Sequence, residues 1–146
     1  MIALVQRVTQ ARVVVDGATV GAIDTGLLVF VCAEPADTPA HAERLVAKLL
    51  ALRIFGDAQG KMNLNLQDVA GGLLLVSQFT LADDTSRGHR PGFSGAAPAA
   101  QGRALFDAVV DLARRQHAPV ACGVFGADMQ VHLVNDGPVT LPITLR

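Results

Sequence analysis

The stretch GGLLLVSQFTL, residues 71–81, sets the centre of the predicted fold. Its two glycines interrupt the preceding segment, and the four apolar residues Leu73 to Val76 follow without a polar break. A short run that is apolar on both faces predicts a strand in the middle of a sheet. The polar residues Ser77, Gln78 and Thr80 come directly after it, so the sequence favours a functional site at the end of a buried strand.

The segment before this strand predicts antiparallel pairing. Residues 13–15 and 18–20 are short runs on either side of Asp16-Gly17, a dipeptide that tolerates the positive φ angles of a tight hairpin turn. Residues 27–32 form a second continuously apolar run. We therefore expect a hairpin near the start of the chain, followed by another central strand.

Two segments have the apolar spacing of three and four residues that predicts a one-faced helix. At the start of the first, Pro39 suits the first turn, and Asp37 or Thr38 can accept bonds from the free N–H groups. The second spans roughly 99–117, with basic residues near its end that suit the helix dipole. The apolar stripe of the first helix consists of Ala42, Leu45, Val46, Leu49 and Leu50. We expect both helices to pack on the same face of the sheet.

The remaining strands complete the expected fold. They are predicted at 53–55 and 61–66, which form a hairpin, and at 120–125, 129–134 and 139–145, separated by turns at 126–128 and 135–138. The expected class is α+β: a mainly antiparallel sheet or open barrel covered by two α-helices. A chain of 146 residues buries roughly two-thirds of its unfolded surface around one core, so we expect a single domain over residues 1–146.

Composition limits the partners of the chain. The formal net charge is -1, so the whole molecule does not attract phosphate as a basic duplex-binding protein does. Aromatic residues make up 4% and all are Phe, which argues against a platform for stacked bases. We expect no DNA partner, and any RNA contact to be local. With no leader pattern and no 18-residue apolar span, we expect a cytoplasmic protein without a membrane segment.

Several patterns of known chemistry are incomplete in this chain. Residues 56–62 approach a phosphate-binding loop, but they are one residue short and place Met62 where Ser or Thr would bind magnesium. Residues 92–96 approach a nucleophile elbow, but the final glycine is missing and no strand precedes it. The four histidines are scattered, and Cys32 and Cys122 stand far apart. We expect no metal and no cofactor, and both cysteines to behave as small buried apolar residues.

Two polar segments at strand ends remain, SQFTL at 77–81 and NDGPVT at 135–140. With them the chain resembles the D-aminoacyl-tRNA deacylase family, which carries a Ser-Gln-Phe-Thr-Leu segment and a Gly-Pro-Val-Thr segment near its C-terminus. Two separated matches in the right order are more specific than any single short motif. Further matches are VQRV at 5–8, GKMNL at 60–64, RP at 90–91 and FGADMQV at 125–131. The chain departs from the family pattern at Gly92, where Ser is usual.

The resemblance implies a hydrolase that releases D-amino acids from tRNA and works as a homodimer. It implies that the Gly137-Pro138 peptide is cis and enters the partner's pocket, where its carbonyls form a rigid wall that excludes L-amino acids. Ser77 is implied to help bind the substrate. Arg7 is implied to brace the Gly-Pro carbonyls by charge-assisted bonds, with a plain exposed ion pair as the alternative. Glycine has no side chain to exclude, so action on glycyl-tRNA is implied as well.

Gln78, Phe79 and Thr80 are the candidate catalytic residues. An aminoacyl ester is activated, so its hydrolysis needs a positioned water and donors for the oxyanion, which backbone N–H groups around Phe79 and Thr80 can supply. The family resemblance also gives Thr80 a claim as nucleophile. No His or Lys stands near it in sequence to activate the hydroxyl, so we favour the main chain together with the substrate's own ribose 2′-hydroxyl.

Residues 82–97 form the longest predicted loop. Its Arg87, His89 and Arg90 are candidates for a phosphate contact at the 3′ acceptor end of tRNA, with an ordinary solvated loop as the alternative. Two rival functions stay open. One is a non-catalytic dimeric binding module in which the Gly-Pro segment only joins the subunits, and the other is a Thr- or Ser-dependent hydrolase of small esters or amides. The preferred D-amino acids do not follow from the sequence.

Overall fold

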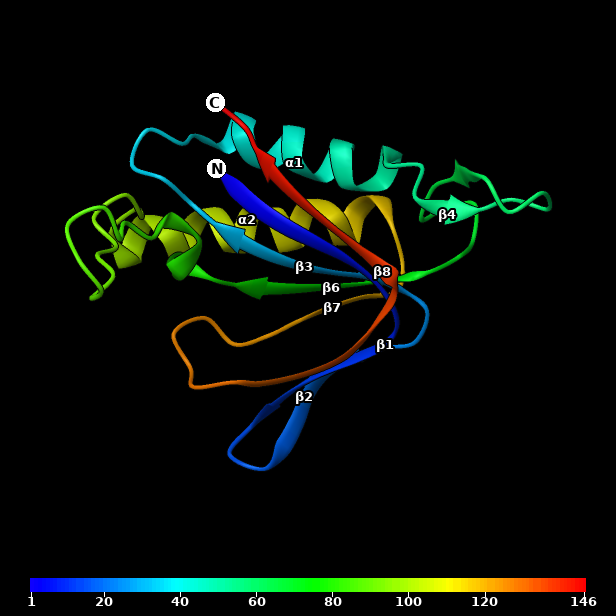
Figure 1. The fold of residues 1–146 in the computed structure, drawn as a ribbon, viewed down its shortest axis with the longest axis horizontal. Coiled ribbons are helices and arrows are strands. Elements are labelled where there is room, and N and C mark those ends of the chain that lie inside the picture. Colours follow the sequence, from blue (N-terminus) through cyan, green and yellow to red (C-terminus); the bar gives the residue numbers. More distant parts are fainter.

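The computed structural model describes residues 1–146 and contains a six-stranded sheet, a separate two-stranded sheet, two α-helices and a short 3-10 helix, η1 (Figure 1). In chain order the elements are β1 (Ile2–Val15), β2 (Ala18–Ile23), β3 (Gly26–Cys32), α1 (Pro39–Ala51), β4 (Phe55–Gly56), β5 (Met62–Leu64), β6 (Gly72–Ser77), η1 (Phe79–Ala82), α2 (Ala99–Gln116), β7 (Val120–Cys122) and β8 (Gln130–Thr144).

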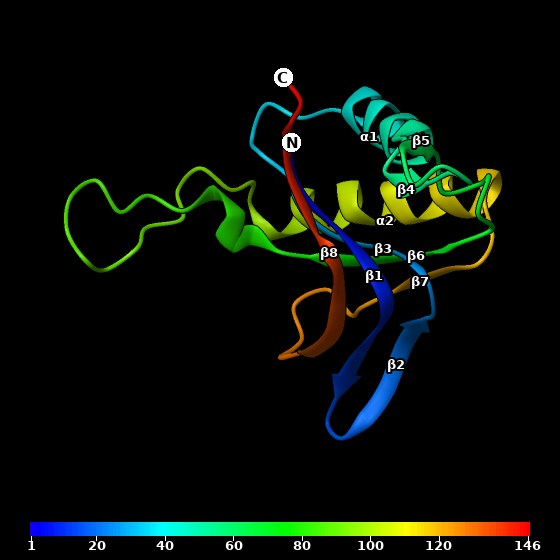
Figure 2. The same cartoon turned by 45° about the vertical axis from the view of Figure 1, so that its right-hand side comes forward.

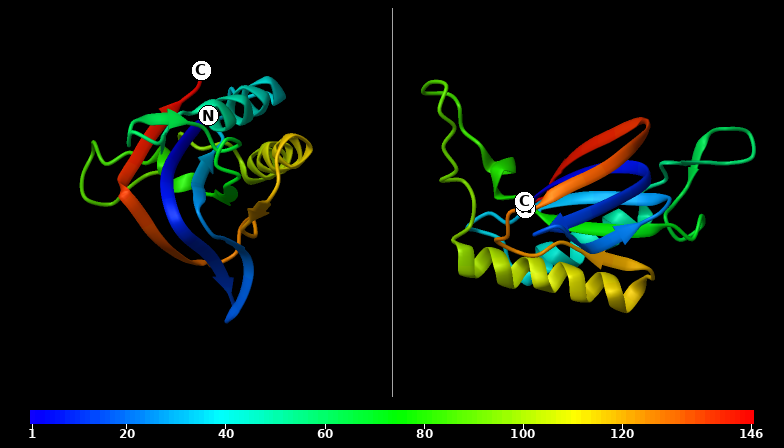
Figure 3. Two further views of the ribbon diagram at one scale, coloured as in Figure 1. Left: turned by 90° about the vertical axis from the view of Figure 1, so that its right-hand side faces the viewer. Right: turned by 90° about the horizontal axis from the view of Figure 1, so that it is seen from below.

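The large sheet is mixed and nearly closes into a barrel. β1 pairs antiparallel with β2, β3 and β8, whereas the pairs β3–β6 and β6–β7 are parallel. The sheet curls so that β2 approaches β7 (Figure 3). At Gly21 of β2 an added Cβ would lie only 2.7 Å from the carbonyl oxygen of Cys122 in β7, so the approach requires a glycine. The expected open barrel covered by two helices is confirmed.

The predicted hairpin and central strands are also confirmed. Asp16 and Gly17 have φ angles of 48° and 77°, and the turn pairs Val15 with Ala18. In the sheet, β3 lies between β1 and β6, and β6 lies between β3 and β7. Neither α1 nor α2 is long and apolar enough to cross a membrane.

The two faces of β6 enter different parts of the core. Leu73 and Leu75 belong to a cluster of 22 buried residues that also includes the inner faces of both helices. Leu74 and Val76 belong to a second cluster of 7 buried residues inside the curl of the sheet. A fully buried Leu stabilises the fold by about 1.5–3 kcal/mol, so the apolar run fixes β6 from both sides.

Both helices cover the same face of the sheet, as expected (Figures 1 and 2). The N-cap residue of α1 is Thr38, and Pro39 occupies the first turn. Asp37 is not the cap, because its carboxylate accepts hydrogen bonds from the Met1 ammonium group and from the backbone N–H of Glu34. The loop after η1 extends away from the body of the molecule (Figure 2).

The predicted turn at residues 135–138 is wrong, because one continuous strand, β8, spans Gln130–Thr144. β1 is 14 residues long and offers β8 a partner along its whole length. The interruption is absorbed by shifts in the β1–β8 register between Gln6 and Gln10. The predicted strand at 120–125 is also shorter, since β7 ends at Cys122.

Candidate active site

The carboxyl ends of two parallel strands define the candidate site. β3 and β6 run in parallel with Val31 opposite Ser77, and the chain turns into η1 directly after β6. The backbone N–H of Gln78 donates to the carbonyl oxygen of Val31 at 2.8 Å, which fixes the first residue beyond the strand. In open sheets with parallel strands, ligands bind in the crevice outside these carboxyl ends.

A pocket of about 610 Å³ opens at this place, a size typical of sites for small molecules. Three residues predicted from the sequence line it: Ser77, Gln78 and Phe79. Thr80 lies beside the pocket in η1 but is not among its lining residues. Most of the lining is apolar, because 15 of its 19 residues are hydrophobic, so the few polar groups at the end of β6 would orient a ligand.

Sequence reasoning missed much of this wall. The pocket residues that it did not assign include Met1, Val31, Cys32, Ala33, Phe93, Ala97, Phe106, Phe125, Gly126, Ala127 and Met129. The segment 125–131 supported the family resemblance without a role being given to it, and this was the signal that could have placed it at the site. The apolar residues carry no chemical signature of their own, so only the fold brings them together.

Phe79 forms the mouth of the pocket. Its side chain is 59% exposed, although it is a large apolar group, and its ring packs edge-to-face against Phe93 with the centroids 5.2 Å apart. This contact joins η1 to the loop that precedes α2, and an aromatic pair in this geometry contributes about 0.5–1.5 kcal/mol beyond its buried area. The exposed ring faces a position that a ligand can occupy.

The side-chain hydrogen bond of Thr80 is not to a base. Its hydroxyl Oγ1 accepts a hydrogen bond from Nε2 of Gln78 at 2.5 Å, and a carboxamide does not remove a proton from a hydroxyl. None of the four histidines lines the pocket. His41 and His117 bond elsewhere, to Thr38 and to the carbonyl oxygen of Gly71 respectively.

The main chain of η1 offers donors instead. The N–H groups at the start of a helix have no partner inside it. Outside the regular helices and strands, neither Phe79 nor Thr80 uses its backbone N–H as a donor. These two groups lie next to Gln78, which lines the pocket, and can therefore face a developing negative charge there.

The Gly137-Pro138 segment lies inside β8, and its peptide bond is cis. Gly137 has a φ of 126°, a conformation that L side chains rarely adopt. A Cβ at this position would lie 3.0 Å from a side-chain methyl carbon of Val139 and 3.1 Å from Nη2 of Arg7. The segment is thus packed on one side by its own chain, and neither of its residues lines the pocket.

Arg7 reaches this segment but not in the manner expected. Its Nε donates to the carbonyl oxygen of Asp136 at 3.2 Å, and its Nη1 donates to the carbonyl oxygen of Ile54 at 2.7 Å. The structure gives it no bond to the carbonyls of Gly137 or Pro138. A longer ion pair of 3.5 Å joins it to the Asp136 carboxylate. Arg7 therefore holds the residue before the Gly-Pro step, and it does so from a side chain that is 15% exposed.

Within one chain the two polar segments stand at opposite ends of the strands. Arg7 pairs with Leu27, and Leu27 pairs with Leu73, so Arg7 and its neighbour Asp136 are level with the start of β6. Ser77 and Gln78 lie at the other end of β6. At roughly 3.3 Å per strand residue, the separation along the sheet is about 15 Å. A segment at that distance does not reach the pocket of its own chain.

The two cysteines differ. Cys32 is buried, lines the pocket, and lies 3.6 Å through its Sγ from the carbonyl oxygen of Phe79, whereas Cys122 is half-buried. Burial, followed by the nearby carboxylate of Glu34, raises the pKa of the Cys32 thiol. Both thiols are free, so the expectation of small apolar residues holds for Cys32 and only partly for Cys122.

The basic residues of the loop 82–97 do not line the pocket. Arg87, His89 and Arg90 are all exposed, and the loop that carries them projects beyond η1 (Figure 2). Its base is closed by paired hydrogen bonds between Asp84 and Gly92. Hydrogen bonds from the side chain and the backbone of Ser86 hold the pKa of the exposed Asp84 below its usual range.

Comparisons with known proteins agree with one another. The family model described as D-Tyr-tRNA(Tyr) deacylase matches residues 4–144. A D-aminoacyl-tRNA deacylase from Azoarcus sp. (strain BH72) is 64% identical over 145 residues, covering 99% of this chain and 96% of the relative. One from Pseudomonas entomophila (strain L48) is 62% identical over 142 residues, covering 97% and 98%.

Solved structures give the same fold. A structure named c-Myc DNA Unwinding Element Binding Protein has a TM-score of 0.94 at 38% identity and covers 100% of this chain and 99% of that one. A second, described as a probable eukaryotic D-amino acid tRNA deacylase, has a TM-score of 0.83 at 18% identity, with 97% of each chain covered. The second likeness supports the fold alone.

Proposed function

The chain belongs to the D-Tyr-tRNA(Tyr) deacylase family, and from that premise we propose that it hydrolyses the ester bond of D-aminoacyl-tRNA in the pocket at the end of β6, with Gly137-Pro138 of a second copy rejecting the L form. The reaction class rests on relatives that are named D-aminoacyl-tRNA deacylase and match nearly the whole chain. The enzyme is a hydrolase acting on carboxylic esters, and its products are the free D-amino acid and tRNA.

The observation that carries the placement is the pocket beside Ser77, Gln78 and Phe79. The substrate ester lies against η1, and the backbone N–H groups of Phe79 and Thr80 stabilise the oxyanion that forms when the carbonyl is attacked. One such donor contributes about 2.7–4 kcal/mol to the barrier reduction. The attacking oxygen comes from water, which the ribose 2′-hydroxyl of the substrate helps to position and activate, and the ester oxygen leaves with the tRNA. The Thr80 hydroxyl is not assigned as the nucleophile, because its side-chain partner is the carboxamide of Gln78 and not a base.

Chiral selection comes from a partner protomer. Gly137-Pro138 lies about 15 Å along the strands from the pocket of its own chain, so it serves the pocket of another copy. β8 supports this arrangement because it is an edge strand, paired with β1 only, and 15 residues long. A long exposed edge offers unpaired backbone groups to a second chain. The partner in the functional state is therefore an identical chain.

The wall itself is backbone. The conformation of Gly137 and the grip of Arg7 on Asp136 hold the segment rigidly, and a rigid clash rejects a ligand that a mobile side chain would admit. Rejecting the L form a thousandfold requires about 4 kcal/mol, because each factor of ten is about 1.4 kcal/mol. Glycine lacks a side chain of either hand, so glycyl-tRNA is a substrate as well.

Contact with the tRNA is local. The acceptor end carries phosphates, and the exposed Arg87, His89 and Arg90 lie on the loop between η1 and α2, whose Phe93 packs against Phe79 of the pocket. The reaction takes place in the cytoplasm, where aminoacyl-tRNA is consumed. The net charge of -1 disfavours binding along a DNA duplex, although one structural relative is named for a DNA element.

The test is deacylation of matched D- and L-aminoacyl-tRNA by the purified protein, followed as free amino acid released over time. The proposal predicts rapid release of the D-amino acid and release of the L-amino acid at least about a thousandfold slower, near the spontaneous rate. Equal rates for both forms would mean that the protein is a deacylase but does not select between D- and L-amino acids. No release of either would favour a dimeric binding module, and release from free amino acid esters alone would favour a small-ester hydrolase.

A further inference from the structure

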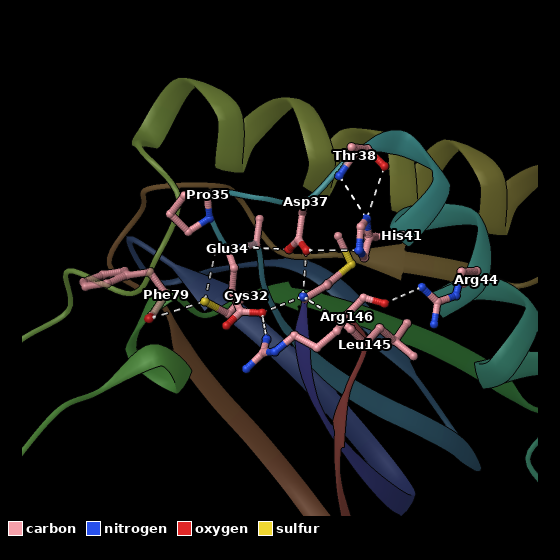
Figure 4. Close-up of polar contacts among 12 residues, drawn as sticks. Cys32, Glu34, Pro35, Asp37, Thr38, His41, Arg44, Phe79, Leu145 and Arg146 are labelled. Atoms are coloured by element: carbon pink, nitrogen blue, oxygen red, sulfur yellow. Dashed lines mark hydrogen bonds and ion pairs between the residues drawn. The ribbon is translucent and has the colours of Figure 1, made fainter.

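The α-ammonium group of Met1 is buried and all of its donors are used. Met1 is 1% exposed. Its ammonium nitrogen donates to Oε2 of Glu34, to Oδ1 of Asp37 and to the carbonyl oxygen of Leu145, each at 2.8 Å. An ammonium group has three N–H donors, so the three acceptors match it one for one. Around it, Figure 4 shows the carboxylates of Glu34 and Asp37 and the backbone of Leu145 converging.

The acceptors are held in place by further contacts. Arg146 forms an ion pair with the same Oε2 of Glu34. The other oxygen of Asp37 accepts the backbone N–H of Glu34 at 2.7 Å, and His41 lies 3.7 Å from its first oxygen. The Asp37 side chain is only 4% exposed. A buried carboxylate needs a charged or hydrogen-bonding partner, and Met1 supplies the only full positive charge in direct hydrogen-bond contact with it.

This cluster is part of the wall of the proposed active site. Met1, Cys32 and Ala33 all line the pocket, and Glu34 follows them in the chain. Cys32 also contacts the carbonyl oxygen of Phe79 through its thiol, which links the wall to η1. From the other side, the backbone N–H of Ala97 donates to the carbonyl oxygen of Ala33 at 2.8 Å.

We propose that the Met1 ammonium group is a positioning group for deacylation: it holds the connection from β3 to α1 against the pocket, and through Cys32 it sets the position of η1. It touches no reacting atom. The proposal rests on the proposed function in so far as that function places the reaction in this pocket. A residue added before Met1 would turn the ammonium into an amide with a single N–H, which leaves two of its three acceptors unmatched.

The first experiment compares the protein with a copy that carries one added glycine before Met1, and with Asp37→Asn. Asp111→Asn is the matched control, because Asp111 is an exposed carboxylate on α2 that forms no ion pair. Both test changes should lower kcat on D-aminoacyl-tRNA between about tenfold and a hundredfold, since displacing positioned groups by ~1 Å has an effect of that order. KM should change little. The combined variant should be no worse than the poorer single one, because both changes act through one contact.

The second experiment tests the position of the pocket wall by thiol labelling, without an activity assay. In a Cys122→Ala background the remaining thiol is Cys32, whose rate of reaction with a small neutral maleimide reports its exposure. The added glycine and Asp37→Asn should raise that rate at least about tenfold in protein that is still folded by circular dichroism, and Asp111→Asn should not. The labelling rate would not respond to a change that lowers the melting temperature but leaves it above the temperature of the assay.

The outcomes separate the two proposals. Lower kcat together with faster Cys32 labelling supports the positioning role. Unchanged kcat and labelling after the glycine addition overturn it, as does a loss of activity that matches a loss of folded protein. If the parent protein deacylates nothing, the proposed function fails, and the labelling rate still decides whether the ammonium group holds the wall.

Discussion

The end of β6 and the middle of β8 both carry residues of the candidate site, but their surroundings differ. Residues 77–79 end a parallel strand, face a pocket of about 610 Å³ and leave the Phe79 ring 59% exposed. Gly137-Pro138 does not line this pocket, and Gly137 packs closely against Arg7 and Val139. The end of β6 therefore has a pocket for a ligand, whereas Gly137-Pro138 has a closely packed backbone that lies outside this pocket.

This difference supports the proposal that the chain carries the two halves of one site at separate ends of its sheet. The halves stand about 15 Å apart along the strands, so neither completes the other within a protomer. In the dimer that we propose, a symmetric pair of chains would bring each wall to the other chain's pocket, since a two-fold contact places the same surfaces on both copies. Of the four substitutions below, three each change one of the two regions and leave the other intact, and the fourth changes the exposed loop.

The largest effect is expected from Gly137→Ala. The new Cβ meets Arg7 and Val139 at 3.1 Å and 3.0 Å, and the φ of 126° does not suit alanine. We expect a loss of about 1–3 kcal/mol in the free energy of unfolding, and a drop of at least about tenfold in the ratio of D to L deacylation. Urea unfolding and paired kcat/KM values measure the two effects. Gly17→Ala, at a positive φ with open space around it, should leave the D to L ratio unchanged.

Arg7→Lys should have the next largest effect. Lysine lacks the planar guanidinium group whose two nitrogens donate to the carbonyl oxygens of Asp136 and Ile54 at the same time. A hydrogen bond from a charged donor contributes about 1.5–3 kcal/mol. We expect partial loss of chiral selection, about tenfold or less, with kcat on the D substrate nearly kept. Arg44→Lys is the control, because the exposed Arg44 of α1 also donates to a carbonyl oxygen, that of Arg146, and belongs to neither region. A loss of kcat without a change in selection would place Arg7 in the chemistry instead.

Thr80→Val tests the pocket region. If the main chain does the chemistry, removing the hydroxyl costs one neutral hydrogen bond with Gln78, about 0.5–1.5 kcal/mol, and kcat falls by less than about tenfold. A Thr nucleophile would instead lose several orders of magnitude, as other covalent catalysts do when the nucleophile is removed. Single-turnover deacylation under saturating enzyme distinguishes the two results. The D to L ratio should not change in either case.

The smallest effect is expected from Arg87→Ala in the exposed loop. The change should raise KM for the charged tRNA by a few fold and reduce the slope of log affinity against log salt by about one, as the loss of one phosphate contact does. Selection and kcat should stay the same. Arg115→Ala, an equal change of charge near the end of α2, serves as the control. Equal effects of both would mean that only net charge matters.

Much of the fold follows from local pattern. The apolar runs of β3 and β6, the Asp16-Gly17 turn and the stripe of α1 each carry a period or a turn signal that neighbouring residues determine. The course of β8 did not follow from local pattern. Asn135 to Pro138 has the composition of a turn, but its conformation is set by pairing with β1, more than 120 residues earlier in the chain.

The candidate site shows the same division. Ser77 and Gln78 were predicted because polar residues after a buried strand are conspicuous, and Phe79 was predicted as a backbone N–H donor in the segment that carries the family resemblance. All three line the pocket. The apolar wall and the ammonium cluster were not predicted. Asp37 was interpreted only as a possible helix cap, since nothing in its own neighbourhood indicates that Met1 lies beside it. Contacts between distant segments become visible only when the sheet brings both ends of the chain together.

The most direct test of the central claim uses a mixed dimer of two differently tagged chains. One chain carries Ala127→Trp, which fills the pocket that Ala127 lines but keeps an intact Gly137. The other carries Gly137→Ala and an open pocket. The single open pocket of this dimer then faces the intact wall of its partner. A control dimer carries Gly137→Ala on both chains and the filled pocket on one.

We predict that the mixed dimer recovers the wild-type ratio of D to L deacylation, at about half the activity per dimer because one of two sites remains. The control dimer should keep the relaxed ratio of Gly137→Ala. If the mixed dimer also keeps the relaxed ratio, or if the chains do not associate, the wall does not act across protomers and the account is contradicted.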